Sequence, residues 1–332
     1  MNVGIVGCGY WGTNLARNFL RSDDFNLKMV ADHDPVQLNR FQELYPDTDV
    51  SHSFQDLLLN TSIDAVAIAT PAGTHFDLAK RALEANRHVL VEKPATTSSK
   101  EMHELIQLAK AKKKVLMVDH TYLYSKAVLE MKAIIDANEL GAIQYIDSER
   151  VNLGKFQPDI NVLWDLATHD ISIVNFLLGD MPKSVQCQAI AHLPTGFENI
   201  AYTTLKYPNN VMVHIHSSWS SPLKRREMLI GGDKKMLRYN DLEPSNKLHI
   251  HDCGHDYSPN KEGSPEIVYR NGTVRSLPIP SKETLGDVVS AFAESIRTGI
   301  HPLGNINFGL EVIQILEAAQ ESIDNGGKTV ML

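Results

Sequence analysis

Three glycines near the start of the chain have a spacing that suits phosphate binding. They stand in Gly7-Cys8-Gly9-Tyr10-Trp11-Gly12, directly after the apolar run from Asn2 to Val6. At this spacing the first glycine permits a tight turn, the second lets a pyrophosphate approach the backbone, and the third lets helix and strand pack closely. The following helix presents free N–H groups and the positive end of its dipole. The motif predicts a dinucleotide-binding turn, whose binding residues include Tyr10 and Trp11.

Asp32 ends the second apolar run, residues 27–32, and lies twenty residues beyond Gly12. A carboxylate at this distance from the glycine motif accepts hydrogen bonds from an adenosine ribose diol. It would repel a 2′-phosphate, and the next two residues, His33 and Asp34, bring no arginine. The sequence therefore favours NAD over NADP as the cofactor.

Lys93 directly follows another apolar run, His88 to Val91, within Glu92-Lys93-Pro94. Ligands of open α/β sheets bind at the carboxyl ends of the strands. An ammonium at that edge can hydrogen-bond the oxygen of an alcohol that reacts with the nicotinamide. The alternative is a solvated lysine after a strand, since most lysines are exposed.

Asp165 and His169 are four residues apart and share one face if they lie on a helix. The carboxylate can fix the imidazole tautomer while the other ring nitrogen faces a substrate, so His169 is a candidate general base. A purely structural Asp/His pair is the alternative. Polar or aromatic candidates for substrate binding flank the pair: Asn152, Lys155, Asn161 and Trp164.

The elements that must position these residues alternate between strands and helices up to residue 120. Short apolar runs over 2–6, 27–32, 63–69, 88–91 and 115–118 are separated by helical patterns over 11–21, 35–45, 74–86 and 98–112. Such alternation requires right-handed crossovers and a parallel sheet. We predict an α/β chain whose residues 1–120 form a doubly wound Rossmann domain.

The pattern changes over residues 121–332, which we assign to a second, α+β domain for substrate binding and oligomerisation. One helix is expected over 125–138, and alternating strands follow, as in Val211 to His216. This alternation is typical of an antiparallel sheet with one covered face. Helices over 165–177, 284–298 and 308–324 would cover the sheet, and the polar stretch 252–265 is expected to be an exposed loop.

Composition narrows the class of protein. The 332 residues carry a formal net charge of -8, so the basic footprint of a nucleic-acid-binding protein is absent. The three cysteines are far apart, and no apolar run is long enough for a membrane span. The first residues lack the basic region of a signal peptide. We expect a cytoplasmic protein with a small-molecule substrate, and neither a nucleic-acid nor a membrane partner.

A histidine-rich run offers a competing chemistry. His249, His251, Cys253 and His255 would alternate onto one face of a strand, and their side chains suit zinc. The run leads into the expected polar loop, and the chemistry of Lys93 needs no metal. We therefore predict no metal site.

With Glu92-Lys93-Pro94, the chain resembles the Gfo/Idh/MocA oxidoreductases. The dinucleotide motif, then Ala69-Thr70-Pro71 with His75, then Glu-Lys-Pro follow one another as in that family. The resemblance covers essentially the whole chain. It implies an open, mostly antiparallel second sheet, a cis Lys93–Pro94 bond and a homo-oligomer, dimer or tetramer. It also implies that Thr70, Pro71, His75, Glu92 and Lys93 bind the cofactor, and it gives Lys93 a catalytic role.

A narrower resemblance lies between Asn161 and Asp170, in Asn-Val-Leu-Trp-Asp-Leu-Ala-Thr-His-Asp. It resembles the nucleotide-sugar branch of the family, whose type activity oxidises UDP-N-acetylglucosaminuronate. The stretch Lys155-Phe156-Gln157 is less basic than in that branch, which puts a uronate substrate in doubt. The resemblance implies a sugar or nucleotide-sugar dehydrogenase. The alternatives are a cyclitol or free-sugar dehydrogenase and a non-catalytic NAD-binding protein.

Overall fold

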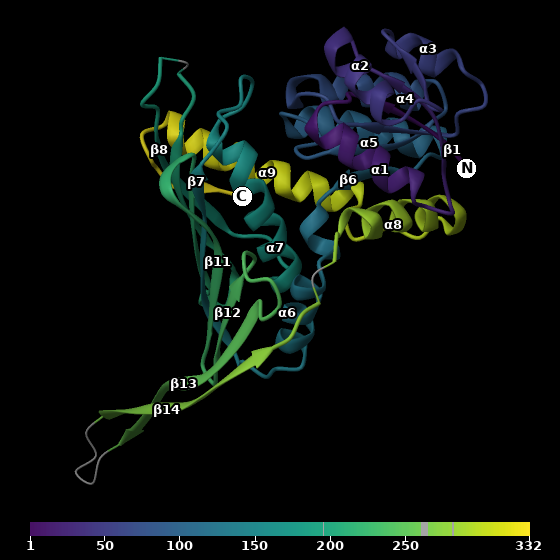
Figure 1. The fold of residues 1–332 in the computed structure, drawn as a ribbon. Helices are drawn as coiled ribbons and strands as arrows, with labels where there is room; N and C mark the ends of the chain where they lie inside the picture. The colour runs from purple at the N-terminus through teal and green to yellow at the C-terminus, as the bar shows by residue number, and fades with distance from the viewer. Residues whose placement is uncertain (195, 260–264, 281) are drawn as a thin grey trace. The chain divides into compact units, whose positions relative to one another are not determined.

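The computed structural model describes residues 1–194, 196–259, 265–280 and 282–332, which form two compact units (Figure 1). The first contains Met1–Tyr124 and Glu283–Gln314, and the second contains Ser125–Lys282 and Ile315–Leu332. Sequence analysis assigned all of 121–332 to the second domain, whereas 283–314 group with the first unit. One reason is that Phe292 stacks on Phe25, with ring centroids 5.8 Å apart.

The first unit is built on a parallel sheet, as predicted. Within the described residues its strands run in the order β3-β2-β1-β4-β5-β6. They are β1 (Asn2–Val6), β2 (Asn26–Ala31), β3 (Asp49–Ser51), β4 (Ala65–Ile68), β5 (His88–Glu92) and β6 (Leu116–Asp119). This order is the doubly wound Rossmann arrangement, in which the order of the strands reverses between β1 and β4. Of these six strands, only the short edge strand β3 was not predicted from the sequence.

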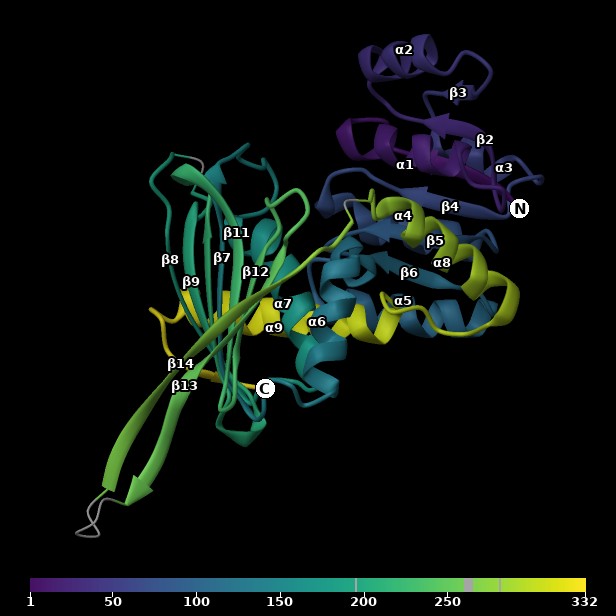
Figure 2. The same cartoon turned by 60° about the horizontal axis from the view of Figure 1, so that its bottom comes forward.

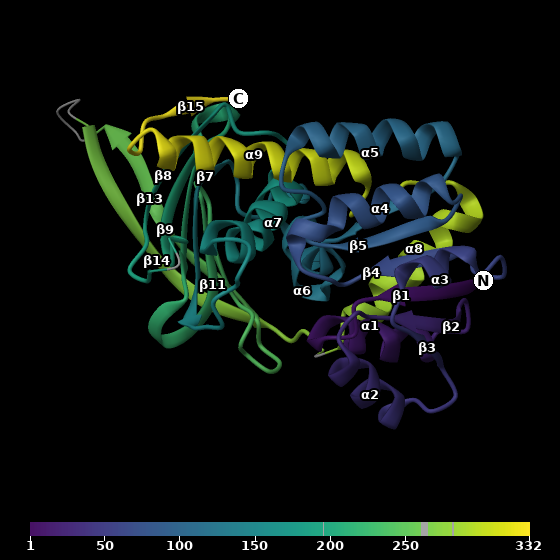
Figure 3. The ribbon, with the colours of Figure 1, turned by 90° about the horizontal axis from the view of Figure 1, so that it is seen from above.

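Helices cover this sheet. They are α1 (Tyr10–Leu20), α2 (Pro35–Leu44), α3 (Phe54–Leu59), α4 (His75–Glu84), α5 (Ser99–Lys112), α8 (Leu285–Thr298) and the first part of α9 (Ile306–Asp324), with the short turns η1 (Ala72–Thr74) and η2 (Thr121–Tyr124). Buried residues of α3, α4 and α5 share one core with the sheet, and α4 lies beside α5 (Figure 3). Helix α1 packs against α8. No described helix is long and apolar enough to cross a membrane.

The second unit is an open sheet with the order β14-β13-β12-β11-β7-β10-β9-β8-β15 within the described residues. The strands are β7 (Ile143–Leu153), β8 (Ser184–Ile190), β9 (Ile200–Lys206), β10 (Met212–Ser218), β11 (Ser220–Gly232), β12 (Met236–Asn240), β13 (Leu248–Pro259), β14 (Pro265–Leu277) and β15 (Val330–Met331). Neighbouring strands are antiparallel except for β10 and β7. The predicted open, mostly antiparallel sheet is confirmed.

Three helices accompany this sheet: α6 (Lys126–Asp136), α7 (Thr168–Leu178) and the end of α9 (Figure 2). Helix α7 packs on β7 and against α6, and the hydroxyl of Ser322 on α9 accepts a hydrogen bond from the backbone N–H of Cys187 on β8. The turns η3 (Leu163–Ala167) and η4 (Pro208–Asn210) complete the unit.

The prediction of an exposed loop over 252–265 is wrong for the described residues. Strands β13 and β14 continue through this region as a two-stranded ribbon, which projects from the rest of the sheet (Figure 1). Residues 260–264 lie outside the described part of the chain. The described side chains over 252–256 and 266–269 are half-buried or exposed, so this part of the sequence lacks the apolar alternation by which a strand is recognised.

Candidate active site

The glycine turn has a steric reason at both of its ends. Gly7 has a φ of 89°, and a Cβ added there would lie 2.7 Å from the carbonyl oxygen of Ala69. A Cβ on Gly12 would lie 1.8 Å from the carbonyl oxygen of Gly7, so only glycine lets α1 approach β1 this closely. At Gly9 an added Cβ would meet nothing within 4 Å. Open space at Gly9 is what a pyrophosphate approaching the backbone requires.

Helix α1 begins directly after this turn without a side-chain cap. Gly9 is its N-cap residue and makes no side-chain hydrogen bond to the first turn. The uncapped N–H groups and the dipole of α1 therefore fit an anionic group. Tyr10 and Trp11 are 78% and 47% exposed, with their rings edge to face at 5.4 Å.

The Asp32 carboxylate is fixed at the end of β2. The backbone N–H of Cys8 donates to Oδ2 at 2.8 Å, and that of Asp34 donates to Oδ1 at 3.0 Å. The first bond ties the acidic side chain to the glycine turn itself. Burial, and then the negative charge of Asp32, raise the pKa of the neighbouring Cys8 thiol to about 12. The side chain of His33 is 94% exposed.

The loops after β4 and β5 are joined by a buried histidine. Both ring nitrogens of His75 lie against backbone carbonyls, Nε2 at 2.8 Å from Thr70 and Nδ1 at 2.7 Å from Pro94. His75 is 1% exposed, so its buried side chain holds the two loops together. Thr70 also shares a hydroxyl contact of 2.7 Å with Thr74, and Pro71 precedes η1. The Lys93–Pro94 peptide bond is cis, as the family resemblance implied.

Lys93 follows β5 and is half-buried, whereas Glu92 beside it is 7% exposed. Burial, and then the neighbouring Asp119, raise the pKa of Glu92 well above its ordinary value. Asp119 ends β6 and is fully buried, and the adjacent His120 is 2% exposed. Sequence analysis missed both residues. An acidic residue at the end of an apolar run, the signal used for Asp32, would have found Asp119.

In the second unit, Asp165 and His169 lie where η3 joins α7. The turn η3 is a π-helix, a form that is common at functional sites. Both side chains are half-buried. The indole Nε1 of Trp219 donates to Asp165 Oδ2 at 3.0 Å, which fixes the carboxylate from a residue 54 positions away. Trp219 was not among the site residues predicted from the sequence.

Trp219 also holds the loop after β7. Its carbonyl oxygen accepts a hydrogen bond of 2.9 Å from the N–H of Gly154, and its ring lies 5.2 Å from that of Phe156. Asn152, near the end of β7, is half-buried, and Lys155 in the loop is exposed. Of the substrate-binding candidates around Asp165, these two and His169 therefore keep solvent-accessible surface.

Asn161 and Trp164 are buried instead. The side chain of Asn161 accepts from the N–H of Trp164 at 3.2 Å and donates to Glu198 and Gln320 at 2.7 and 2.9 Å. It thus caps the start of the helix and ties it to neighbouring segments. Trp164 is 8% exposed and packs in the core. In this structure both residues support the position of Asp165 and His169.

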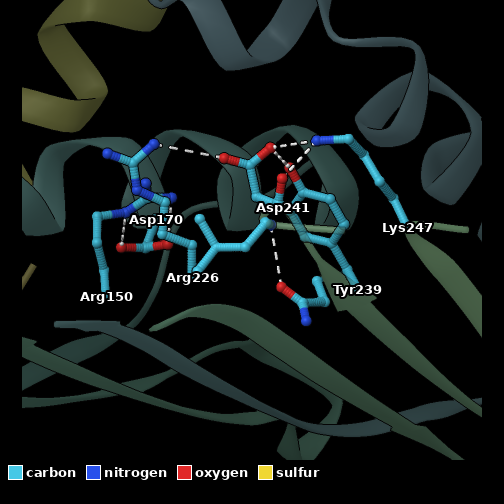
Figure 4. Close-up of polar contacts among 8 residues, drawn as sticks. Arg150, Asp170, Arg226, Tyr239, Asp241 and Lys247 are labelled. Carbon is cyan, nitrogen blue, oxygen red and sulfur yellow. Dashed lines mark hydrogen bonds and ion pairs between the residues drawn. The ribbon is translucent and has the colours of Figure 1, made fainter. Parts of the chain in front are cut away.

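A buried ionic network anchors the first turn of α7 to the sheet (Figure 4). Arg150 of β7 binds Asp170 through two hydrogen bonds of 2.8 and 3.0 Å, and both side chains are at most 5% exposed. Asp241 lies nearby and accepts from Lys247 at 2.9 Å and from Tyr239 at 3.1 Å. Burial acts to raise the pKa of Asp241, but Lys247 and the charges of Arg150 and Arg226 bring it below its ordinary value.

The histidine-rich run lies on β13, where His249, His251, Cys253 and His255 pair with residues of β14. Among the described residues, no three or more His, Cys, Asp or Glu side chains gather in an arrangement that could hold a metal.

Two family models match this chain. The model described as "Oxidoreductase family, NAD-binding Rossmann fold" matches residues 1–120, and that of the "GFO/IDH/MocA C-terminal domain" matches residues 128–238. Together they cover well over half of the sequence. The chain belongs to the Gfo/Idh/MocA family. The resemblance found in the sequence is thereby confirmed.

Members of the family with related sequences act on different substrates. The scyllo-inositol 2-dehydrogenase (NADP(+)) IolW of Bacillus subtilis is 25% identical, over 100% of this chain and 96% of its own length. The UDP-N-acetylglucosamine 3-dehydrogenase of Acidithiobacillus ferrooxidans is 27% identical, over 76% of this chain and 78% of its own.

Solved structures share the fold of this chain. That of the same A. ferrooxidans enzyme, GnnA, has a TM-score of 0.81 at 23% identity and covers 98% of both chains. The structure of GenD2 from gentamicin A biosynthesis, in complex with NAD, has a TM-score of 0.84 at 20% identity. It covers 100% of this chain and 96% of its own.

Proposed function

We propose that this protein is an NAD-dependent dehydrogenase that interconverts a secondary alcohol and a ketone of a sugar, in the first instance a nucleotide sugar. The observation that carries the proposal is the arrangement at one edge of the parallel sheet. The glycine turn after β1, Asp32 after β2 and Lys93 after β5 all stand at carboxyl ends of its strands. Ligands of doubly wound sheets bind at that edge.

The residues present fit NAD. The uncapped start of α1 and the open space at Gly9 would hold the pyrophosphate, and Asp32, fixed by two backbone N–H groups, would hold the adenosine ribose. Its carboxylate would repel a 2′-phosphate, which supports NAD over NADP. NAD supplies the hydride acceptor or donor when bound.

We propose that Lys93, His169 and Asp165 carry out the proton chemistry. We assign Lys93 to hydrogen-bond the reacting oxygen and His169 to take the hydroxyl proton as general base. Asp165, held by Trp219, would orient the imidazole of His169. If Lys93 takes the proton instead, loss of the His169 imidazole will cost much less activity than loss of the ammonium.

The nucleotide-sugar substrate is supported by the segment Asn161–Asp170 and by the relative named UDP-N-acetylglucosamine 3-dehydrogenase. Exposed Lys155 and half-buried Asn152 could contact a diphosphate or sugar hydroxyls. A cyclitol dehydrogenase is the second candidate. It is favoured by the scyllo-inositol 2-dehydrogenase relative, which this chain matches along its full length.

The test is a substrate panel on the purified protein, with NAD and NADP compared by titration. UDP- and dTDP-linked sugars, free sugars and inositols are each followed by the absorbance of the reduced nicotinamide. We expect NAD to bind more tightly and a nucleotide sugar to react. His169→Asn and Lys93→Met should lower kcat by roughly 100- to 10,000-fold, as loss of general acid–base catalysis does. The dinucleotide affinity of His169→Asn should change little.

Matched controls are His103→Asn and Lys100→Met, which change exposed residues of α5. Both should retain full activity. Turnover of inositols alone would replace the nucleotide sugar by the second candidate. Dinucleotide binding without turnover of any panel member would favour a non-catalytic protein, and absence of dinucleotide binding would refute the proposal.

A further inference from the structure

Two acidic side chains that the proposed reaction does not use face each other beside Lys93. Glu92 at the end of β5 is the direct strand partner of Asp119 at the end of β6. Glu92 is 7% exposed and Asp119 is 0% exposed. Buried acidic groups are rare unless cations or hydrogen-bond donors compensate them. The contacts of this pair therefore decide its charge.

Few donors reach the two carboxyl groups. Thr121 Oγ1 donates to Asp119 Oδ1 at 2.8 Å. In the described residues, no N–H or O–H group reaches Glu92 Oε1 or Asp119 Oδ2, and both atoms are buried. An ionised carboxylate only accepts hydrogen bonds, whereas a protonated carboxyl group can also donate one. A proton on one of these two neighbouring groups would therefore supply the donor that the other lacks.

The charges around the pair also favour one proton. Lys93 is the cation whose charge acts on both Glu92 and Asp119. His120 cannot add a second positive charge at neutral pH, since burial, and then the charge of Lys93, lower its pKa to about 3. Tyr124 stays neutral, because burial raises its pKa to about 12.

The pKa of each carboxyl changes in the same direction. Burial and the neighbouring Asp119 raise the pKa of Glu92 well above its ordinary value, and burial raises that of Asp119 to about 6. Two carboxyl groups this close cannot both ionise easily, so they titrate as one coupled pair.

We propose that Glu92 and Asp119 share a single proton, and that the resulting monoanionic pair is the counter-ion that positions the Lys93 ammonium for its part in the reaction. The positioning role rests on the proposed function, whereas the shared proton does not. With one proton, the pair and Lys93 together are neutral. A second proton would remove the negative charge that the pair contributes beside Lys93, and loss of the first would leave two negative charges buried together.

The first measurement is infrared spectroscopy of the purified protein, which needs no substrate. The wild type should show a protonated-carboxyl C=O band at neutral pH that is absent from both Glu92→Gln and Asp119→Asn. In each single variant the amide supplies the missing donor, and the remaining carboxyl ionises as the partner of Lys93. Lys93→Met should strengthen the band, because without the cation the pair takes up a second proton. Lys100→Met should leave the band unchanged.

The second measurement separates charge from hydrogen bonding. Each single amide variant keeps one negative charge and should stay within about 10-fold of wild-type kcat/KM. The double variant Glu92→Gln/Asp119→Asn keeps the hydrogen-bonding groups but loses the charge, and should lose roughly 100-fold. If the double variant does not fold, the dependence of kcat/KM on pH in the alkaline range provides the test instead. In the wild type kcat/KM should change as the pair loses its proton. In both single variants this change should be absent, because their remaining carboxyl group has no proton to release.

The shared proton would be overturned if the wild type showed no protonated-carboxyl band at neutral pH, or if the band it shows were still present in Glu92→Gln. A double variant as active as the single ones would overturn the counter-ion role. If the band behaves as expected but no substrate turns over, the proposed function fails and the shared proton stands.

Discussion

Each unit of this protein holds two acidic residues that are buried or half-buried, but the two sets have different numbers of cations around them. The first unit sets Glu92 and Asp119 against Lys93. In the second unit three cations lie around two acidic residues (Figure 4). Arg150 binds Asp170, and Arg226 and Lys247 bind Asp241.

The difference appears in how the carboxyl groups titrate. Burial dominates in the first unit, where it raises the pKa of Glu92 and of Asp119. In the second unit Asp241 is half-buried, with 17% of its side chain exposed. Its partial burial acts to raise the pKa, yet hydrogen bonding and charge from Lys247, with Arg150 and Arg226, lower it. Burial alone thus does not fix the state of an acidic side chain. The number of neighbouring cations decides whether it keeps a proton, as we infer for Glu92 and Asp119, or stays ionised.

The comparison predicts its largest effect for removal of a cation from the second unit. Arg150→Met leaves the Asp170 charge buried without its partner, which costs about 3–5 kcal/mol of the free energy of unfolding. Urea unfolding measures the loss. Arg225→Met is the matched control, since Arg225 binds Glu149 at 3.0 Å while 49% exposed, and should cost less than about 1 kcal/mol.

A double variant tests whether this loss comes from the uncompensated charge. Arg150→Met/Asp170→Leu removes both charges and should recover much of the stability lost in Arg150→Met, because buried ion pairs are often replaceable by apolar residues. A double variant less stable than Arg150→Met would show that geometry, and not charge, is what the pair supplies.

A smaller effect, with a defined pH dependence, is expected at Asp241. Asp241→Asn should cost about 2 kcal/mol at neutral pH, since it weakens hydrogen bonds to a charged group. The folded pKa lies below the ordinary value of 3.8, so the stability that the carboxylate contributes is present above that value. It is lost as the pH falls through the folded pKa. Denaturant unfolding should therefore show the two proteins converging in acid, whereas Asp147→Asn, at an exposed position of β7, should match the wild type throughout.

The sequence reveals more of the candidate site in the first unit than in the second. The glycine turn, Asp32 and Lys93 are local features, because each stands at the end of an apolar run whose strand direction can be predicted. Asp119 obeys the same rule and could have been found by it. Its pairing with Glu92 could not, since it depends on β5 and β6 being neighbours in the sheet.

In the second unit the supports of the site come from distant parts of the chain. Trp219 holds Asp165 across 54 residues, and Arg150 holds Asp170 across 20. Nothing in the sequence near Asp165 indicates either partner. Asn161 was predicted to contact substrate, as a polar residue beside the site, yet it caps the helix start and is 5% exposed. Polar type alone does not separate a residue that binds ligand from one that holds the backbone.

The smallest predicted effect concerns Glu92 and has the opposite pH dependence to that of Asp241. The folded pKa of Glu92 is raised, so its protonated form stabilises the fold below the ordinary value of 4.5, and this contribution is lost as the pH rises through the folded pKa. While the folded pair holds one proton more than the unfolded chain, stability falls by about 1.4 kcal/mol per pH unit. Glu92→Gln cannot titrate and should lack this slope.

Urea unfolding of both proteins at about pH 6 and about pH 7 should therefore move their difference in the variant's favour by up to about 1.4 kcal/mol. Glu84→Gln, an exposed residue of α4, should run parallel to the wild type. If Glu92→Gln also runs parallel, the folded pair holds no extra proton in this range. The conclusion that the Glu92/Asp119 pair keeps a proton because only one cation is near it would then be wrong. A stability difference that moves in favour of Glu92→Gln as the pH rises, together with equal stabilities of Asp241→Asn and the wild type in acid, would support both halves of the comparison.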